Sequence, residues 1–145
     1  MKAENGGHHQ LSVMVVDDDP NIGRLIKRNL EGNGTRVIEA ASGLDCLETL
    51  HREKVDLLIL DLNLPDFSGW GILSLLRLTA SLRQMPVIVA TVEPRDQSLV
   101  DRYQPDDYIQ KPFDIRDLLL RVRRVIGAGS AAGAPVKGKL STRES

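Results

Sequence analysis

The segment Leu11-Ser12-Val13-Met14-Val15-Val16-Asp17-Asp18-Asp19-Pro20 joins a short apolar run to three consecutive aspartates. The run is too short for a helix and rich in valine, which favours a buried β-strand. We expect Asp19 to cap a following helix with Pro20 at its first position, since helix starts prefer both residue types there. Asp17 and Asp18 then stand at the carboxyl end of the strand.

Further strand patterns alternate with helical patterns outward from this segment. Strands are predicted over residues 36–40, 55–60, 86–91 and 108–109, and helices over 21–30, 44–50, 71–78, 96–103 and 115–126. Strands that are apolar on both faces belong in a parallel sheet covered by helices, so we expect an α/β, doubly wound fold of three layers. Ligands of such folds bind beyond the carboxyl ends of the strands.

Composition limits the remaining possibilities. The 145 residues are 41% hydrophobic and carry a net charge of -1, which suits one domain and gives no overall attraction to nucleic acid or acidic membranes. Cys46 is the single cysteine, which excludes an internal disulfide framework. No apolar run approaches the roughly 18 residues of a membrane span. We therefore expect a cytoplasmic protein with a tail over residues 1–10, one domain over 11–127 and a linker over 128–145.

The ends of the other predicted strands carry polar side chains. Asp61 follows the third strand, Thr91 ends the fourth, and Lys111 follows the fifth. Parallel strands bring these residues to one edge, together with Asp17 and Asp18. Clustered carboxylates raise a pKa or recruit a cation, and oxygen ligands without histidine or cysteine favour Mg²⁺. A carboxylate beside a metal, an ammonium and a hydroxyl is suited to phosphoryl transfer.

Together these segments resemble the receiver domain of bacterial two-component response regulators. The resemblance covers about residues 11–127 and rests on Val15-Val16-Asp17-Asp18-Asp19-Pro20, Leu60-Asp61-Leu62-Asn63-Leu64-Pro65, Gly69, Pro86-Val87-Ile88 with Thr91, Asp107-Tyr108 and Lys111-Pro112-Phe113. It implies a flavodoxin-like, CheY-like fold with a five-stranded parallel sheet in the order 2-1-3-4-5 and five helices.

The resemblance also implies a role for each residue at the strand ends. Asp61 is the expected phosphoacceptor, and Lys111 is expected to bind a phosphoryl oxygen. Mg²⁺ is the expected cofactor, and its expected ligands are Asp17 (mostly through water), Asp18, Asp61 and the backbone carbonyl of Asn63. Thr91 and Tyr108 form the expected switch, in which the threonine hydroxyl turns to the phosphoryl group and the tyrosine moves inward. Pro112 stands where the family often has a cis peptide bond.

Three departures from the family pattern bear on function. Val92 replaces the usual alanine or glycine and is expected to narrow access to the phosphoacceptor. Gln104-Pro105 replaces the usual Gly-Ala at the end of a short fourth helix. Asn63 and Glu93 occupy positions that tune the lifetime of the phosphoryl group in the family, and both are polar.

The resemblance names partners as well. A sensor histidine kinase is the expected phosphoryl donor, and no membrane partner is expected. The charges of the last helix suit a solvated face, but their spacing also resembles receivers of winged-helix transcription factors, which dimerise through the fourth helix, fifth strand and fifth helix. The residues expected to pair across that two-fold axis are Arg95 with Asp117 and Asp107 with Arg121. The tail at 139–144 resembles the opening of a helix-turn-helix DNA-binding domain, or is a polar tail, so DNA would be contacted only through an output domain outside this chain.

Two other functions compete with a phosphorylated signalling switch. A phosphatase with an aspartyl nucleophile commonly has a second aspartate two residues later, where this chain has Asn63 and therefore lacks the general acid. A receiver-like docking module that is never phosphorylated is supported only by Val92, and Asp18, Asp61, Thr91 and Lys111 argue against it.

Overall fold

The computed structural model describes residues 10–32 and 34–130. Five strands and five helices alternate along this part of the chain. The strands are β1 (Leu11–Val16), β2 (Thr35–Ala40), β3 (Leu57–Leu60), β4 (Val87–Thr91) and β5 (Asp107–Gln110). The helices are α1 (Pro20–Leu30), α2 (Gly43–Arg52), α3 (Gly69–Leu78), α4 (Gln97–Tyr103) and α5 (Ile115–Ser130).

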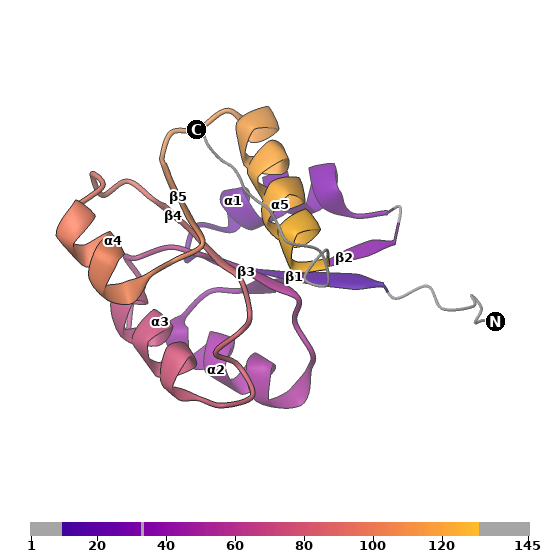
Figure 1. The fold of residues 1–145 in the computed structure, drawn as a ribbon. Coiled ribbons are helices and arrows are strands. Elements are labelled where there is room, and N and C mark those ends of the chain that lie inside the picture. The colour runs from indigo at the N-terminus through magenta and orange to yellow at the C-terminus, as the bar shows by residue number, and fades with distance from the viewer. Residues whose placement is uncertain (1–9, 33, 131–145) are drawn as a thin grey trace.

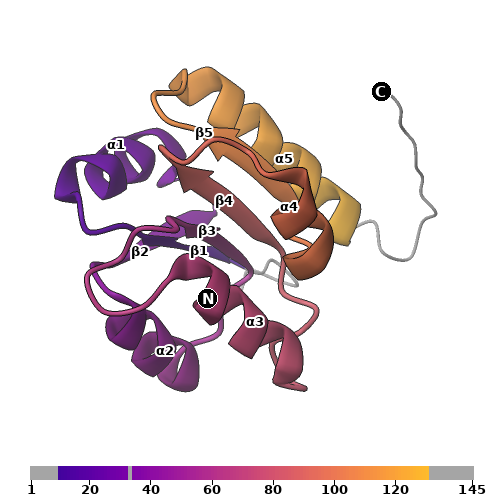
Figure 2. The ribbon, with the colours of Figure 1, turned by 90° about the vertical axis from the view of Figure 1, so that its left-hand side faces the viewer.

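The strands form one parallel sheet in the order β2-β1-β3-β4-β5, which confirms the predicted fold and strand order. Figures 1 and 2 show α1 and α5 on one face of this sheet and α2 and α3 on the other. Parallel strands buried on both faces are expected to be continuously apolar, and β3 and β4 are buried along their whole length.

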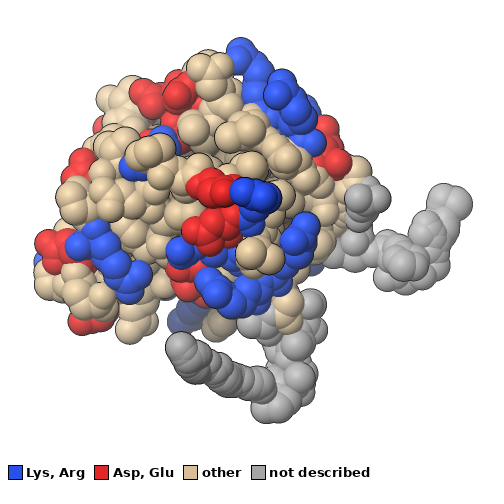
Figure 3. All heavy atoms as spheres, turned by 90° about the horizontal axis from the view of Figure 1, so that it is seen from above, with Lys and Arg blue, Asp and Glu red and all other residues tan. Residues whose placement is uncertain are grey.

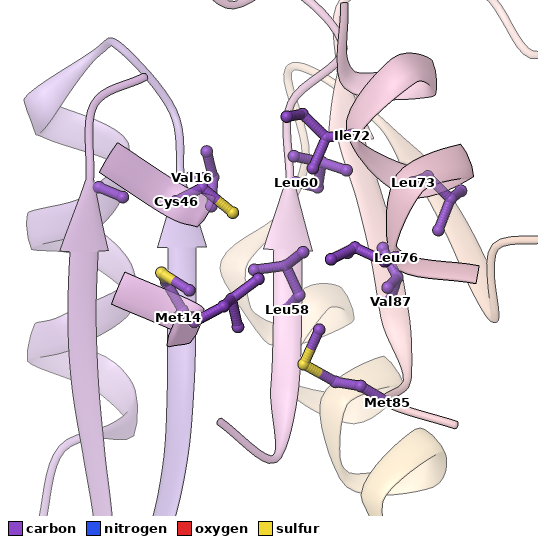
Figure 4. Close-up of a cluster of buried hydrophobic side chains, with 12 residues drawn as sticks. Met14, Val16, Cys46, Leu58, Leu60, Ile72, Leu73, Leu76, Met85 and Val87 are labelled. Carbon is purple, nitrogen blue, oxygen red and sulfur yellow. The ribbon is translucent and has the colours of Figure 1, made fainter. Parts of the chain in front are cut away.

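The two faces of the sheet bury separate apolar clusters. Figure 4 shows the cluster on the face of the sheet that α2 and α3 cover, which includes Met14 and Leu58 of the sheet and Leu73 and Leu76 of α3. Val15 and Ile59 point to the other face and pack with Ile26 of α1 and Leu118 of α5. Alternate residues of the central strands therefore anchor helices on opposite faces, which fixes the positions of the strand ends relative to one another.

Cys46 belongs to the first of these clusters. The residue is fully buried, and burial raises the pKa of its thiol to about 12. A thiol with so high a pKa is a poor nucleophile at neutral pH, so the structure agrees with a packing role for Cys46.

Side-chain caps set the starts of the helices. Asp19 accepts a hydrogen bond from the backbone N–H of Asn21, and Pro20 is the first residue of α1, as predicted. Ser42, Ser68 and Asp96 cap α2, α3 and α4 in the same way. The predicted start of the fourth helix at Asp96 was therefore one residue early, since Asp96 is the cap. Gln104 ends α4 in the left-handed conformation, with φ of 54°.

Several predicted boundaries differ from the structure. The third strand begins at Leu57 rather than Val55, and directly before it the Asp56 carboxylate accepts a hydrogen bond from the Ser12 N–H. β2 begins at residue 35 and β5 covers four residues rather than two, since Asp107 and Gln110 also pair with β4. α5 continues to Ser130, four residues beyond its predicted end at residue 126.

The predicted tails fall almost entirely on residues 1–9 and 131–145, which lie outside the described residues. Within residues 10–32 and 34–130, none of the helices combines the length and apolar character needed to cross a membrane.

Candidate functional site

The predicted strand-end residues do meet at one edge of the sheet. Asp17 follows β1, Asp61 follows β3, and Thr91 is the last residue of β4. All three are buried, with exposed fractions of 7%, 5% and 0%, whereas Asp18 is exposed. The site is therefore an acidic pocket with two buried carboxylates, Asp17 and Asp61, and one exposed carboxylate, Asp18.

Lys111 links the two buried carboxylates. Its Nζ donates to Asp17 Oδ2 at 2.6 Å and to Asp61 Oδ2 at 2.9 Å. The lysine follows β5 and is held by its backbone N–H, which donates to the Thr91 carbonyl at 2.7 Å. The Lys111-Pro112 peptide bond is cis, as the resemblance implied.

Backbone groups fix the orientation of both carboxylates. Asp17 Oδ1 accepts from the Asp19 N–H at 2.9 Å, and Asp61 Oδ1 accepts from the Asn63 N–H at 3.1 Å. The Asp61 N–H donates in turn to the Val16 carbonyl at 2.9 Å, which continues the pairing of β3 with β1. In each carboxylate, one oxygen therefore accepts a hydrogen bond from the loop that follows it, and the other accepts from Lys111.

Burial and ion pairing act against each other in the pKa values of this pocket. Burial raises the pKa of Asp17 above its ordinary value, and the hydrogen bond from Lys111 offsets only part of that rise. Burial alone would lower the pKa of Lys111, but its hydrogen bonds to Asp17 and Asp61 raise it above its ordinary value. The lysine therefore stays charged at neutral pH and is positioned as a fixed cation.

The acidic residues fit a divalent cation. One carboxylate oxygen from each of Asp17, Asp18 and Asp61 lies within 4.8 Å of the other two. Three hard oxygen donors that are incompletely neutralised by one ammonium match the preferences of Mg²⁺ better than those of Zn²⁺, which favours nitrogen and sulfur ligands. The predicted carboxylate ligands are thus brought together, and the Asn63 backbone follows Asp61 by two residues.

Comparison with known proteins agrees with this geometry. Residues 13–123 match the family described as the response regulator receiver domain. The chain belongs to this family. As a receiver domain it is a signalling switch of two-component systems and not a turnover enzyme.

Among curated relatives, the transcriptional regulatory protein KdpE of Mycobacterium tuberculosis is 38% identical over 124 residues, which cover 83% of this chain and 53% of that protein. The receiver therefore spans about half the length of the curated relatives it matches.

Solved structures give the same fold. A CheY-like receiver domain from Methanospirillum hungatei is 27% identical, with a TM-score of 0.78 over 85% of this chain and 98% of that one. The BeF3-activated receiver domain of DrrB, a protein of Thermotoga maritima, is 32% identical, with a TM-score of 0.72 over 81% and 98% of the two chains.

The predicted switch residues of this receiver lie beside the acidic pocket. Tyr108 is 5% exposed, and its hydroxyl donates to the Glu93 carbonyl at 2.8 Å and lies 3.3 Å from the Pro94 carbonyl. Both carbonyls belong to the segment that joins Thr91 to α4. Tyr108 is therefore buried against the segment that directly follows Thr91.

Two contacts near the pocket were not predicted from the sequence. Asn63 Nδ2 donates to Glu93 Oε2 at 3.1 Å, which joins the loops after β3 and β4 beside Asp61. Asp66 accepts from the N–H groups of Gly43 and Leu44 at 2.8 and 2.9 Å and so ties the loop after Asp61 to the start of α2. The polar character of Asn63 and Glu93 was the only sequence signal for the first contact.

The residues of the predicted dimer face find partners inside one chain. Arg121 donates to Asp107 at 2.9 Å and to Asp117 at 3.1 Å, and Arg124 donates to Asp107 at 2.9 Å. Arg95 donates to Gln97 instead. Figure 3 shows acidic and basic side chains lying against each other near the centre of the face that is seen from above. Pairing across a two-fold axis stays a prediction, and it would require these partners to exchange.

Proposed function

We propose that this receiver accepts a phosphoryl group from a sensor histidine kinase on Asp61 in a Mg²⁺-dependent reaction. The observation that carries the proposal is the Asp61 carboxylate itself, which is buried, oriented by the Asn63 N–H and paired with the charged Lys111. The membership of the chain in the receiver family supports the same chemistry.

The residues of the chain divide the reaction between them. An Asp61 oxygen forms a bond to phosphorus as the bond from phosphorus to the donor imidazole nitrogen breaks, and the imidazole keeps the electron pair. The Lys111 ammonium, already in place, donates to a phosphoryl oxygen, and the Thr91 hydroxyl donates to the same group. Mg²⁺, when bound, supplies positive charge beside the phosphoryl oxygens. The negative charge gained at Asp61 then draws Thr91 inward and changes the surface around α4.

Trp70 provides a direct test because it is the only tryptophan of the chain and α3 begins beside Asp61. Addition of beryllofluoride, which mimics a phosphoryl group, should change Trp70 fluorescence in the presence of Mg²⁺ and leave it unchanged with EDTA. A chain that binds no beryllofluoride at any Mg²⁺ concentration would instead support the phosphorylation-independent docking module.

Val92 is predicted to slow phosphorylation by small donors. The residue follows Thr91 and is 57% exposed, so its two methyl groups stand at the surface next to the buried hydroxyl. Val92→Ala should speed phosphorylation by acetyl phosphate about fivefold, the change that a steric barrier of about 1 kcal/mol would produce. Rates are compared by intact-mass measurements over time, and equal rates would show that Val92 does not restrict access.

We propose a role in transcriptional control, exerted through an output domain. Several relatives carry names of transcriptional regulators, and one from Synechocystis is described as DNA-binding. Because this chain spans about half of those proteins, DNA contact would belong to a part outside it.

We also propose that phosphorylation favours a homodimer through α4, β5 and α5, in which Asp107 and Arg121 exchange their partners within the chain for partners across a two-fold axis. Light scattering should show a dimer with beryllofluoride and a monomer without it. A monomer in both states at high concentration would contradict this arrangement.

A further inference from the structure

Three aromatic rings form a stack next to the phosphorylation site. The Trp70 ring lies 5.1 Å from the Tyr103 ring and 6.3 Å from the Tyr108 ring, measured between centroids, with interplanar angles of 19° and 28°. The indole is thus in stacking contact with both tyrosines of the chain. Such offset stacks are favourable beyond the area that they bury.

Hydrogen bonds attach the start of α3, where Trp70 lies, to the loop that follows Asp61. The Gly69 N–H donates to the Leu62 carbonyl at 2.9 Å, and the Trp70 N–H donates to the hydroxyl of the capping residue Ser68 at 3.1 Å. These bonds fix the Trp70 backbone relative to the phosphoacceptor, and the contacts with the two tyrosine rings place the indole.

The two tyrosines belong to the parts of the receiver that would respond to phosphorylation. Tyr103 is the last residue of α4, and Tyr108 lies in β5 with its hydroxyl on the Glu93 and Pro94 carbonyls. The Arg95 guanidinium also lies over the Tyr108 ring, 5.9 Å from its centroid. The stack consequently connects the start of α3, the end of α4 and β5.

We propose that Trp70 is a positioning residue for Tyr108 and that its indole holds Tyr108 in the buried rotamer before Asp61 is phosphorylated. This inference rests on the proposed function because it concerns the same switch. An aromatic contact of this kind corresponds to about a two- to tenfold change in the ratio of buried to exposed rotamers. In the parent chain, Tyr108 therefore changes little when a phosphoryl mimic binds.

The test uses the full chain labelled with 3-fluorotyrosine. The chain has two tyrosines, so two fluorine resonances are expected, and Tyr103→Phe assigns them. The measured quantity is the difference in the Tyr108 fluorine shift between H₂O and D₂O, which reports contact with solvent. Loss of the ring current of Trp70 affects both solvents equally and cancels from this difference.

Trp70→Leu should increase the solvent dependence of Tyr108 severalfold without beryllofluoride, and beryllofluoride should reduce it again. Trp70→Phe keeps an aromatic ring at the position and should retain most of the protection. Tyr103→Leu, which removes the outer ring of the stack, should give a smaller increase and serves if Trp70→Leu does not fold.

The inference would be overturned if the Tyr108 fluorine shift depended equally on solvent in the parent and in the Trp70→Leu chain. If Trp70→Leu does not fold, the same comparison is made between the parent and the Tyr103→Leu chain. The same spectra test the proposed function separately, because bound beryllofluoride gives its own fluorine signal. If that signal is absent from the parent with Mg²⁺, the phosphoacceptor role of Asp61 fails. The comparison of the two chains without beryllofluoride still decides the role of Trp70.

Discussion

Asp61→Asn should abolish phosphorylation of the receiver by acetyl phosphate. The amide lacks the anionic oxygen that attacks phosphorus, and it removes one of the two carboxylates that pair with Lys111. The expected result is a complete loss of the phosphorylated species in intact-mass spectra, with the fold retained by circular dichroism. Phosphorylation of the variant at the parent rate would show that Asp61 is not the acceptor.

Asp19→Asn is the matched control for this change. Asp19 belongs to the same run of aspartates, but its side chain caps α1 by accepting from the Asn21 N–H. Asparagine caps helices about as well as aspartate. Phosphorylation should therefore proceed at the parent rate, whereas a large loss would indicate that Asp19 takes part in the acidic pocket.

Gly69→Ala should lower the free energy of unfolding by about 1–3 kcal/mol, the usual cost of overpacking. A Cβ at this position would lie 2.4 Å from the Asp61 carbonyl oxygen and 2.7 Å from the Leu62 Cα, and both are backbone atoms that cannot rotate away. The same clash would displace the backbone of the phosphoacceptor, so phosphorylation should slow as well. Urea denaturation measures the first effect and intact mass the second.

Gly71 lies two residues further along α3 and provides the control. A Cβ there meets nothing within 4 Å, so Gly71→Ala gains helix propensity without a clash. Its free energy of unfolding should rise by up to about 1 kcal/mol. Equal destabilisation by both substitutions would mean that the close approach of α3 to Asp61 does not limit residue 69.

The grouping of the site residues could be predicted because it follows from topology. Alternating apolar patterns imply a parallel sheet, and the carboxyl ends of its strands necessarily meet at one edge. Asp17, Asp61, Thr91 and Lys111 were therefore placed together without knowledge of any distance. The capping role of Asp19 was equally predictable, since it depends only on neighbouring residues.

Contacts between side chains on separate loops could not be predicted in this way. The Asn63–Glu93 hydrogen bond and the stack of Trp70 with two tyrosines join residues 30 to 38 positions apart, and they depend on the path of each loop. The pairing of Arg121 with Asp107 depends on the turn into α5 in the same manner, whereas its pairing with Asp117 follows from the i,i+4 spacing of one helix. Sequence spacing shows which charges are present, but the backbone decides which pairs lie within reach.

Mapping of the modified residue tests the central claim most directly. The full chain is incubated with acetyl phosphate and Mg²⁺, the acyl phosphate is trapped by borohydride reduction, and peptides are sequenced by mass spectrometry. The account predicts one modified residue, Asp61, in the sample with Mg²⁺ and none in the sample with EDTA. Modification at another aspartate, or none at Asp61 when Mg²⁺ is present, would contradict it.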